Sequence, residues 1–307
     1  MGHLPTISIV TPCLNRAGFI AEAIESVQQQ NYPYVEHLIV DGGSTDGTLE
    51  GVGRYPHLHV SSEPDEGIYD ALSKGIDRSH GEVIGFLNTD DLYEPGTLEI
   101  VGRTFADNPQ ADAVVGGASI FCTAADGKRT TLSIFPCVGQ NELLLRSTQG
   151  APVFNAWFFR RRLFDELGFF DCQYRYVADR DLLIRMALQD SPYVSLDNTL
   201  YHYRMHPGSY TLSGQDSGEA GYMFECRAVA ERYLGLKGIG TEASDCLKAW
   251  HSQITMEHIL TAWRRKAFGR ATGYMLIGLR HNLSGWPTVF MRTARERFSI
   301  LMAGDTR

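Results

Sequence analysis

The chain lacks the features that mark secreted, membrane-spanning and metal-stapled proteins. Its six cysteines are scattered with no Cys-x-x-Cys pair, which favours reduced thiols over a zinc site or a disulfide framework. No apolar run reaches the length of a membrane span, and the first residues lack the basic, apolar and small-residue order of a signal peptide. We therefore expect a cytoplasmic protein, in which contact with the inner face of the cytoplasmic membrane stays open.

An excess of positive charge is also missing. The net charge of −8 over 307 residues leaves no overall positive field to collect phosphates, so we expect no nucleic-acid partner. A bound metal can still reverse the sign of a local site and attract a phosphorylated small molecule. Hydrophobic residues make up 43% and charged residues 21% of the chain, which is typical of a globular protein with ample core material.

The N-terminal part alternates strands with a helix. Residues 7–10 and 37–40 are β-rich apolar runs, and apolar residues recur at helical spacing over 20–27. This order predicts a parallel βαβ unit, whose two strands deliver their loops to the same edge of a sheet. Asp41 therefore comes to lie near the loop that follows Pro12. Its carboxylate can accept the imide N–H of uracil or thymine, bind a ribose hydroxyl, or simply form a turn beside the glycines.

A third apolar strand, over residues 83–87, runs directly towards Asp90 and Asp91. In an open α/β sheet, ligands bind at the carboxyl ends of the strands. Two adjacent aspartates repel each other, so a cation is expected between them and any anionic substrate. Mg²⁺ or Mn²⁺ holding a diphosphate meets this need; alternatively, one of the two carboxylates caps the helix that begins near Pro95.

Four motifs of the first hundred residues together resemble the family 2 glycosyltransferases of GT-A fold. They are Ile9-Val-Thr-Pro-Cys-Leu-Asn-Arg16, Val40-Asp-Gly-Gly-Ser-Thr-Asp-Gly-Thr48, Ser62-Glu-Pro-Asp-Glu-Gly-Ile-Tyr-Asp-Ala-Leu-Ser-Lys-Gly75 and Phe86-Leu-Asn-Thr-Asp-Asp91. The resemblance implies a Rossmann-like α/β fold with a twisted, mostly parallel sheet flanked by helices. It also implies transfer of a sugar from a nucleotide diphosphate donor with inversion, assisted by Mn²⁺ or Mg²⁺.

Carried over residue by residue, the resemblance implies a donor site. Pro12 and Leu14 would lie beside the base, Asp41 on the uracil or thymine edge, and Asp90 near the ribose, while Asp91 would be the main metal ligand. Leu14 departs from the aromatic residue that is frequent at its position. The remaining donor-site predictions are Asn15, Asp65, Lys74 and His206. Asp65 and Lys74 can equally form a turn and a solvated helix face.

Residues 155–171 and 176–186 resemble the acceptor half of the same family, in which an aspartate at the start of a helix is the catalytic base. Asp179 takes that position and shares a helix face with apolar residues, which can raise its pKa. Its alternative role is an N-cap, and Asp181 would then cap the helix or pair with Arg180 or Arg185. Further along the chain, His206 is predicted to reach the diphosphate or the metal.

Two weaker signals complete this half. Trp157 can form a wall for a sugar ring, although a large aromatic residue is more often core. Residues 120–136 alternate enough to predict a hairpin around Asp126-Gly127. The resemblance covers residues 7–213, and we expect a catalytic domain over 1–213.

Residues 214–307 carry helical rather than strand patterns and are locally basic. We expect a helical C-terminal extension that either touches an anionic membrane peripherally or packs on the catalytic domain or another subunit. A homo-oligomer is therefore left open.

The function that we predict is inverting transfer from a nucleotide sugar, with a UDP-sugar favoured, to a hydroxyl of a saccharide or lipid-linked acceptor. The alternatives are a nucleotidyltransferase and a non-catalytic nucleotide-sugar-binding scaffold of the same fold. A nicotinamide-dependent oxidoreductase is poorly supported, because the glycines do not form Gly-x-Gly-x-x-Gly.

Overall fold

The computed structural model describes residues 3–124, 126–150, 153–206, 216–282 and 285–286. The chain divides into two compact units, Met1–Gly214 and Gln215–Arg307. The boundary that we predict from the sequence, between residues 213 and 214, falls outside the described residues. Of the helices that are described, none is long and apolar enough to cross a bilayer.

The strands of the first unit form one sheet of mixed direction. Their order across it is β3-β2-β1-β4-β8-β6-β9-β5, with β7 paired to β6. The bounds are β1 (Ile7–Cys13), β2 (Val35–Asp41), β3 (His59–Ser62), β4 (Val83–Phe86), β5 (Leu92–Tyr93), β6 (Ala113–Thr123), β7 (Arg129–Phe135), β8 (Trp157–Arg160) and β9 (Tyr193–Arg204).

The parallel pairings lie mainly among the first four strands. β1 pairs with β2 and β4, and β2 pairs with β3, all in parallel, as the βαβ pattern predicts. Beyond β4 the sheet becomes mixed, because β8 runs antiparallel to both β4 and β6 while β6 and β9 are parallel. The predicted hairpin is confirmed as β6 and β7, with Asp126 accepting a hydrogen bond from the backbone of Lys128 at its turn.

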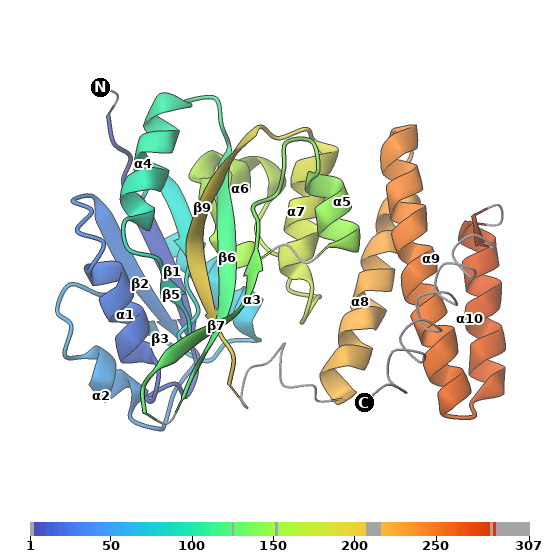
Figure 1. Ribbon diagram of the computed structural model, residues 1–307, viewed down its shortest axis with the longest axis horizontal. Helices are drawn as coiled ribbons and strands as arrows, with labels where there is room; N and C mark the ends of the chain where they lie inside the picture. The colour runs from blue at the N-terminus through green and yellow to red at the C-terminus, as the bar shows by residue number, and fades with distance from the viewer. Residues whose placement is uncertain (1–2, 125, 151–152, 207–215, 283–284, 287–307) are drawn as a thin grey trace. The chain divides into compact units, whose positions relative to one another are not determined.

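Helices cover both faces of the sheet, as Figure 1 shows for α1 and α4 on one side and α6 and α7 on the other. The apolar side chains of α1 and α4 pack on the face that carries Ile9 and Phe158. The opposite face carries a group of phenylalanines in which Phe154 stacks on both Phe86 and Phe159. The bounds are α1 (Ile20–Gln28), α2 (Thr48–Val52), α3 (Ile68–Arg78), α4 (Thr97–Asp107), α5 (Leu143–Gln149), η1 (Phe154–Ala156), α6 (Arg161–Leu167) and α7 (Ala178–Leu188).

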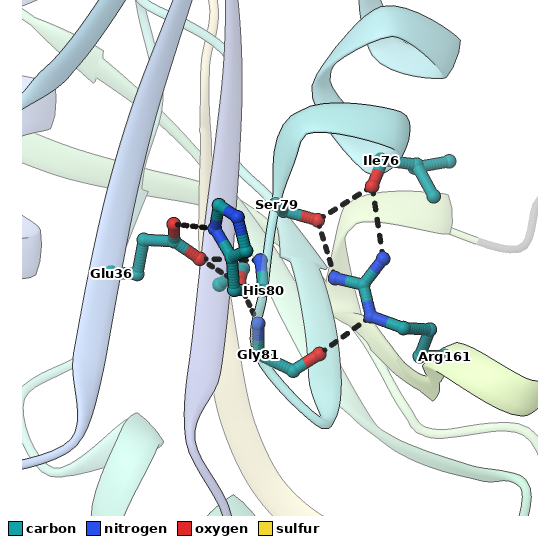
Figure 2. Close-up of polar contacts among 7 residues, drawn as sticks. Glu36, Ile76, Ser79, His80, Gly81 and Arg161 are labelled. Atoms are coloured by element: carbon teal, nitrogen blue, oxygen red, sulfur yellow. Dashed lines mark hydrogen bonds and ion pairs between the residues drawn. The ribbon is translucent and has the colours of Figure 1, made fainter.

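Arg161, the first residue of α6, hydrogen-bonds the C-terminal end of α3 and the turn after it (Figure 2). Its guanidinium donates to the carbonyl of Ile76 at 3.0 Å, the hydroxyl of Ser79 at 2.7 Å and the carbonyl of Gly81 at 2.9 Å. These acceptors lie at the end of a helix and in the turn after it, where carbonyls have no helical partner. The side chain therefore fixes the turn that leads into β4, and β4 leads to Asp90.

The described part of the second unit is helical, as the sequence predicts. It contains α8 (Asp216–Leu234), α9 (Thr241–Arg264) and α10 (Phe268–His281). The ring of the buried His258 lies 4.7 Å from that of Phe224 and stacks on that of Tyr274 at 5.0 Å. Burial, and then the charge of Arg227, lower the pKa of His258 to about 4, so the ring is neutral at pH 7.

Candidate active site

Asp90 and His206 meet at the sheet edge beyond β4. Nε2 of His206 lies 2.9 Å from Oδ2 of Asp90, and both side chains keep a small exposed fraction. The ring of Phe19 packs 4.6 Å from that of His206 and supports it from the loop that follows β1. A carboxylate oxygen and an imidazole nitrogen at this separation fit two neighbouring ligands of one Mn²⁺ or Mg²⁺ ion.

Asp91 points the other way, into the protein, where only 1% of its surface is exposed. Its Oδ2 accepts from the Tyr201 hydroxyl at 2.6 Å and from the Asn88 amide at 3.2 Å, and its Oδ1 accepts from the Arg204 backbone at 2.7 Å. Burial, and then the charge of Asp90, raise its pKa. The role of Asp91 as metal ligand stays a prediction, and this geometry speaks against it because an ion would have to displace protein donors.

Arg204, the last residue of β9, is buried and holds the loop that carries Asp90 and Asp91. Its Nε donates to the backbone carbonyl of Asp90 at 2.8 Å, and one Nη donates to Glu22 at 2.8 Å. The guanidinium also lies 4.9 Å from the ring centre of Phe121. The last residue of β9 therefore positions Asp90.

Asp41 lies at the end of β2, as expected, but its carboxylate oxygens already accept hydrogen bonds from donors of the protein. Oδ2 accepts from the Gly43 and Ser44 backbones and from the Ser62 hydroxyl, and Oδ1 accepts from the Ser44 hydroxyl. Burial alone would raise its pKa, yet these bonds hold it below the ordinary value. A carboxylate with four donors has little acceptor capacity left for a base.

Asp65 lies over the backbone of Gly42, beside Asp41. A Cβ atom at Gly42 would clash with Oδ2 of Asp65, so glycine is what allows the carboxylate to approach. Its Oδ1 accepts from the Gly67 backbone at 2.9 Å. Burial is the main cause of its raised pKa.

The other residues predicted for the nucleotide-sugar site mostly make contacts within or between the loops and helices around it. The amide oxygen of Asn15 accepts from the Thr45 backbone at 2.9 Å, which ties the loop after β1 to the loop after β2. Lys74 forms an ion pair with Asp70 at 2.9 Å. Pro12 is buried within β1, whereas Leu14 is 48% exposed at the same edge.

Asp179 is the second residue of α7 and is partly buried. Its Oδ1 accepts from the Arg180 backbone at 2.7 Å, and the Tyr69 hydroxyl also hydrogen-bonds its carboxylate. Burial raises its pKa, and the opposing effects of Arg180 and Tyr69 do not cancel the rise. A carboxylate with a raised pKa is suited to accept a proton from a hydroxyl.

Asp181, two residues further along α7, has a different environment. It is fully buried and accepts from the guanidinium of Arg185 at 3.0 Å. Arg185, one of the two partners that the sequence left open, therefore binds it. Asp179, by contrast, is only partly buried, and its role as the base stays a prediction.

Trp157 is fully buried and belongs to the interior of β8. It stacks on Phe159 and packs against Tyr193, as expected for a core residue. It also lines a cavity of about 180 Å³ together with residues of β6 and with Arg146 of α5.

Two tyrosines that hydrogen-bond the candidate aspartates were not identified from the sequence. Tyr201 of β9 donates to Asp91 and accepts from the Asn155 amide at 2.8 Å. Tyr69 lies within a motif that carries the resemblance, next to Asp70, and the aromatic residue inside that acidic, glycine-flanked segment was the available signal. Among the described residues, a group of three side chains whose ligand atoms lie close enough together to hold a metal ion occurs in the second unit. It consists of Glu231, His251 and His281.

Comparison with known proteins supports the resemblance. The profile described as Glycosyl transferase family 2 matches residues 8–168. A PGL/p-HBAD biosynthesis glycosyltransferase of Mycobacterium bovis is 31% identical over 187 residues, which cover 59% of this chain and 69% of that protein. The putative teichuronic acid biosynthesis glycosyltransferase TuaG of Bacillus subtilis is 33% identical over 100 residues, or 31% of this chain and 40% of TuaG.

Solved structures share the fold. S. aureus TarS 1-349 in complex with UDP-GlcNAc matches with a TM-score of 0.62 at 16% identity and covers 87% of this chain and 90% of that one. The mannosyltransferase PcManGT from Pyrobaculum calidifontis, in complex with GDP-Man and Mn²⁺, matches with a TM-score of 0.58 at 17% identity, covering 99% of this chain and 89% of that one. The predicted fold class is thereby confirmed.

Proposed function

Because the chain belongs to glycosyl transferase family 2 and is a glycosyltransferase, we propose that it transfers a sugar from a nucleotide diphosphate donor with inversion at the anomeric carbon. The observation that carries this proposal is the pair of separate carboxylate sites, Asp90 with His206 and Asp179 with Tyr69. One site suits the departing diphosphate and the other suits the incoming hydroxyl.

Asp90 and His206 would hold the divalent cation. Their ligand atoms are already within 2.9 Å of each other, and Arg204 holds the backbone of Asp90 in place. When bound there, the cation would offset the charge of the departing nucleoside diphosphate. This proposal assigns the metal to Asp90 in place of Asp91, whose oxygens accept hydrogen bonds from Tyr201, Asn88 and the Arg204 backbone.

Asp179 would act as the base. It removes the proton of an acceptor hydroxyl, whose oxygen bonds to the anomeric carbon while the bond from that carbon to the diphosphate oxygen breaks. Attack from the opposite face inverts the configuration. A raised pKa favours this proton transfer because it makes the carboxylate a stronger base.

Asp65 is our candidate for reading the base of the donor. Its Oδ2 lies against Gly42 at the strand-end loop, whereas the oxygens of Asp41 are already occupied by internal donors. A uracil or thymine ring presents an imide N–H, which can donate a hydrogen bond to such an oxygen. The TarS complex contains UDP-GlcNAc and the PcManGT complex contains GDP-Man, so a uridine donor is the first to test and a guanosine donor the second.

The acceptor would be a saccharide or lipid-linked hydroxyl, the class suggested by relatives named for PGL and teichuronic acid biosynthesis. The test is a calorimetric titration of the full chain with UDP-, dTDP- and GDP-sugars, each with and without Mn²⁺ or Mg²⁺. Metal-dependent binding of one donor, lost in Asp90→Asn, supports the proposal. Equal binding by wild type and variant, or no binding of any donor, contradicts the donor site.

A further inference from the structure

The turn between α9 and α10 exposes two large aromatic side chains. Trp263, beside the end of α9, is 58% exposed, and Phe268, at the start of α10, is 62% exposed. Aromatic side chains carry much apolar surface, and their exposure as a pair on one short turn is unusual for a surface that faces only water.

The apolar surface continues along α10. Met275 and Leu276 are 40% and 64% exposed and follow Phe268 at seven and eight residues, which places all three on one side of the helix. Ala271 and Gly278 are buried and mark the side that packs within the unit. One side of α10 therefore packs within the unit, and another side carries an apolar stripe that is exposed.

Cationic side chains lie beside the N-terminal end of this stripe. The exposed basic residues of the turn are Arg264, Arg265, Lys266 and Arg270. No ion pair joins these four to an acidic residue in the described part of the chain. In the sequence, no Asp or Glu occurs between Glu257 and Glu296, although the whole chain has a net charge of −8. The positive charge is thus concentrated on this segment.

We propose that the α9–α10 turn binds the surface of an anionic lipid bilayer. Trp263 and Phe268 enter the headgroup region, and the adjacent cations lie beside lipid phosphates. The exposed stripe of α10 argues for a bilayer over nucleic acid, since phosphates alone would leave Met275 and Leu276 without an apolar environment. The inference deepens the proposed function by giving access to a lipid-linked acceptor, but the binding itself does not depend on catalysis.

The test is flotation of the full chain with vesicles of phosphatidylcholine alone or mixed with phosphatidylglycerol. We expect binding to the anionic vesicles, weakened on the order of tenfold by Trp263→Ser with Phe268→Ser. A triple Arg264→Glu, Arg265→Glu, Lys266→Glu variant should abolish the preference for anionic lipid. Leu236→Ser, which alters a residue 54% exposed in the same unit, is the matched control and should bind like wild type.

Three outcomes would overturn the proposal: equal partition onto both vesicle types, undiminished binding of the aromatic variant, or preferential capture by a single-stranded oligonucleotide added as competitor. Circular dichroism confirms that each variant is folded. Donor titration is run in parallel, so a failed donor site and a failed lipid surface give separate results.

Discussion

Asp90 and Asp91 are neighbours in the chain but differ in what their carboxylates contact. The Asp90 carboxylate meets His206 at 2.9 Å and keeps partial exposure, whereas Asp91 accepts hydrogen bonds from Tyr201 and the Arg204 backbone. One strand, β9, therefore anchors Asp91 directly and holds Asp90 through its backbone.

This difference predicts opposite effects of two matched substitutions. Asp90→Asn should reduce Mn²⁺-dependent donor binding at least tenfold while leaving the free energy of unfolding within about 0.5 kcal/mol of wild type. Asp91→Asn should lower that free energy by about 3 kcal/mol, because its amide would oppose the buried donors. Calorimetry and urea unfolding measure the two effects. A stable Asp91→Asn variant that loses metal binding would restore Asp91 as the ligand.

Asp179 should control turnover without controlling donor affinity. We expect Asp179→Asn to lower kcat by about 10³-fold with an unchanged Kd for the donor, since a lost base affects only the proton transfer. Asp181→Asn is the comparison, and it should instead lower the free energy of unfolding because it breaks the buried pair with Arg185. Full turnover by Asp179→Asn would exclude this base.

The pH dependence of the reaction should report the environment of Asp179. A base must be deprotonated to act, and burial raises the pKa of Asp179. The acid limb of kcat/KM should therefore lie at a higher pH than the value of about 4 that an ordinary aspartate would give. Tyr69→Phe removes a hydrogen bond that lowers this pKa, so the limb should move to still higher pH. A limb that stays in place or moves down would rule out this positioning role for Tyr69.

Gly42→Ala should act through Asp65. The added methyl group would push the Asp65 carboxylate away, so we expect donor affinity to fall roughly tenfold with little change in unfolding. Gly18→Ala is the control, because a Cβ there meets no atom within 4 Å. If both variants bind the donor equally well, Asp65 does not read the base.

The neutral His258 makes the helical unit sensitive to acid. Its pKa is about 4 in the folded chain and near 6.5 in the unfolded chain, so the unfolded chain binds the extra proton between these values. Stability should be fully present above pH 6.5 and fall towards pH 4, by at most about 3 kcal/mol. Hydrogen exchange of α9 measures the loss locally, apart from His37 of β2, whose pKa is also lowered by burial. The signal of α9 includes His251, a buried residue of the same helix whose pKa burial lowers as well. His258→Phe keeps an aromatic ring at this position and should reduce the loss, leaving the part that His251 causes.

The strands over residues 7–10, 37–40 and 83–87 and the helix over 20–27 followed from local patterns, because parallel βαβ units have regular spacing, whereas β3 and α2 were not predicted. The position of β8 between β4 and β6 did not follow, since a short apolar strand carries no signal of its partner. Asp179 was identified as a candidate by its place in a motif. The residues that donate hydrogen bonds to Asp91 could not be identified from the sequence. Tyr201 lies 110 residues away from Asp91, and a contact over that distance depends on the folded sheet.

The dependence of Asp91 on β9 has a consequence for biosynthesis. Tyr201 and Arg204 leave the ribosome 110 and 113 residues after the residues of the aspartate loop that they contact. At translation rates of roughly 5–20 residues per second, the nascent chain waits on the order of 5–20 seconds for them. A chain arrested before residue 201 would contain β1, β2, β3 and β4 without the donors of β9 that hold Asp90 and Asp91, and chaperone protection would be needed most during that interval.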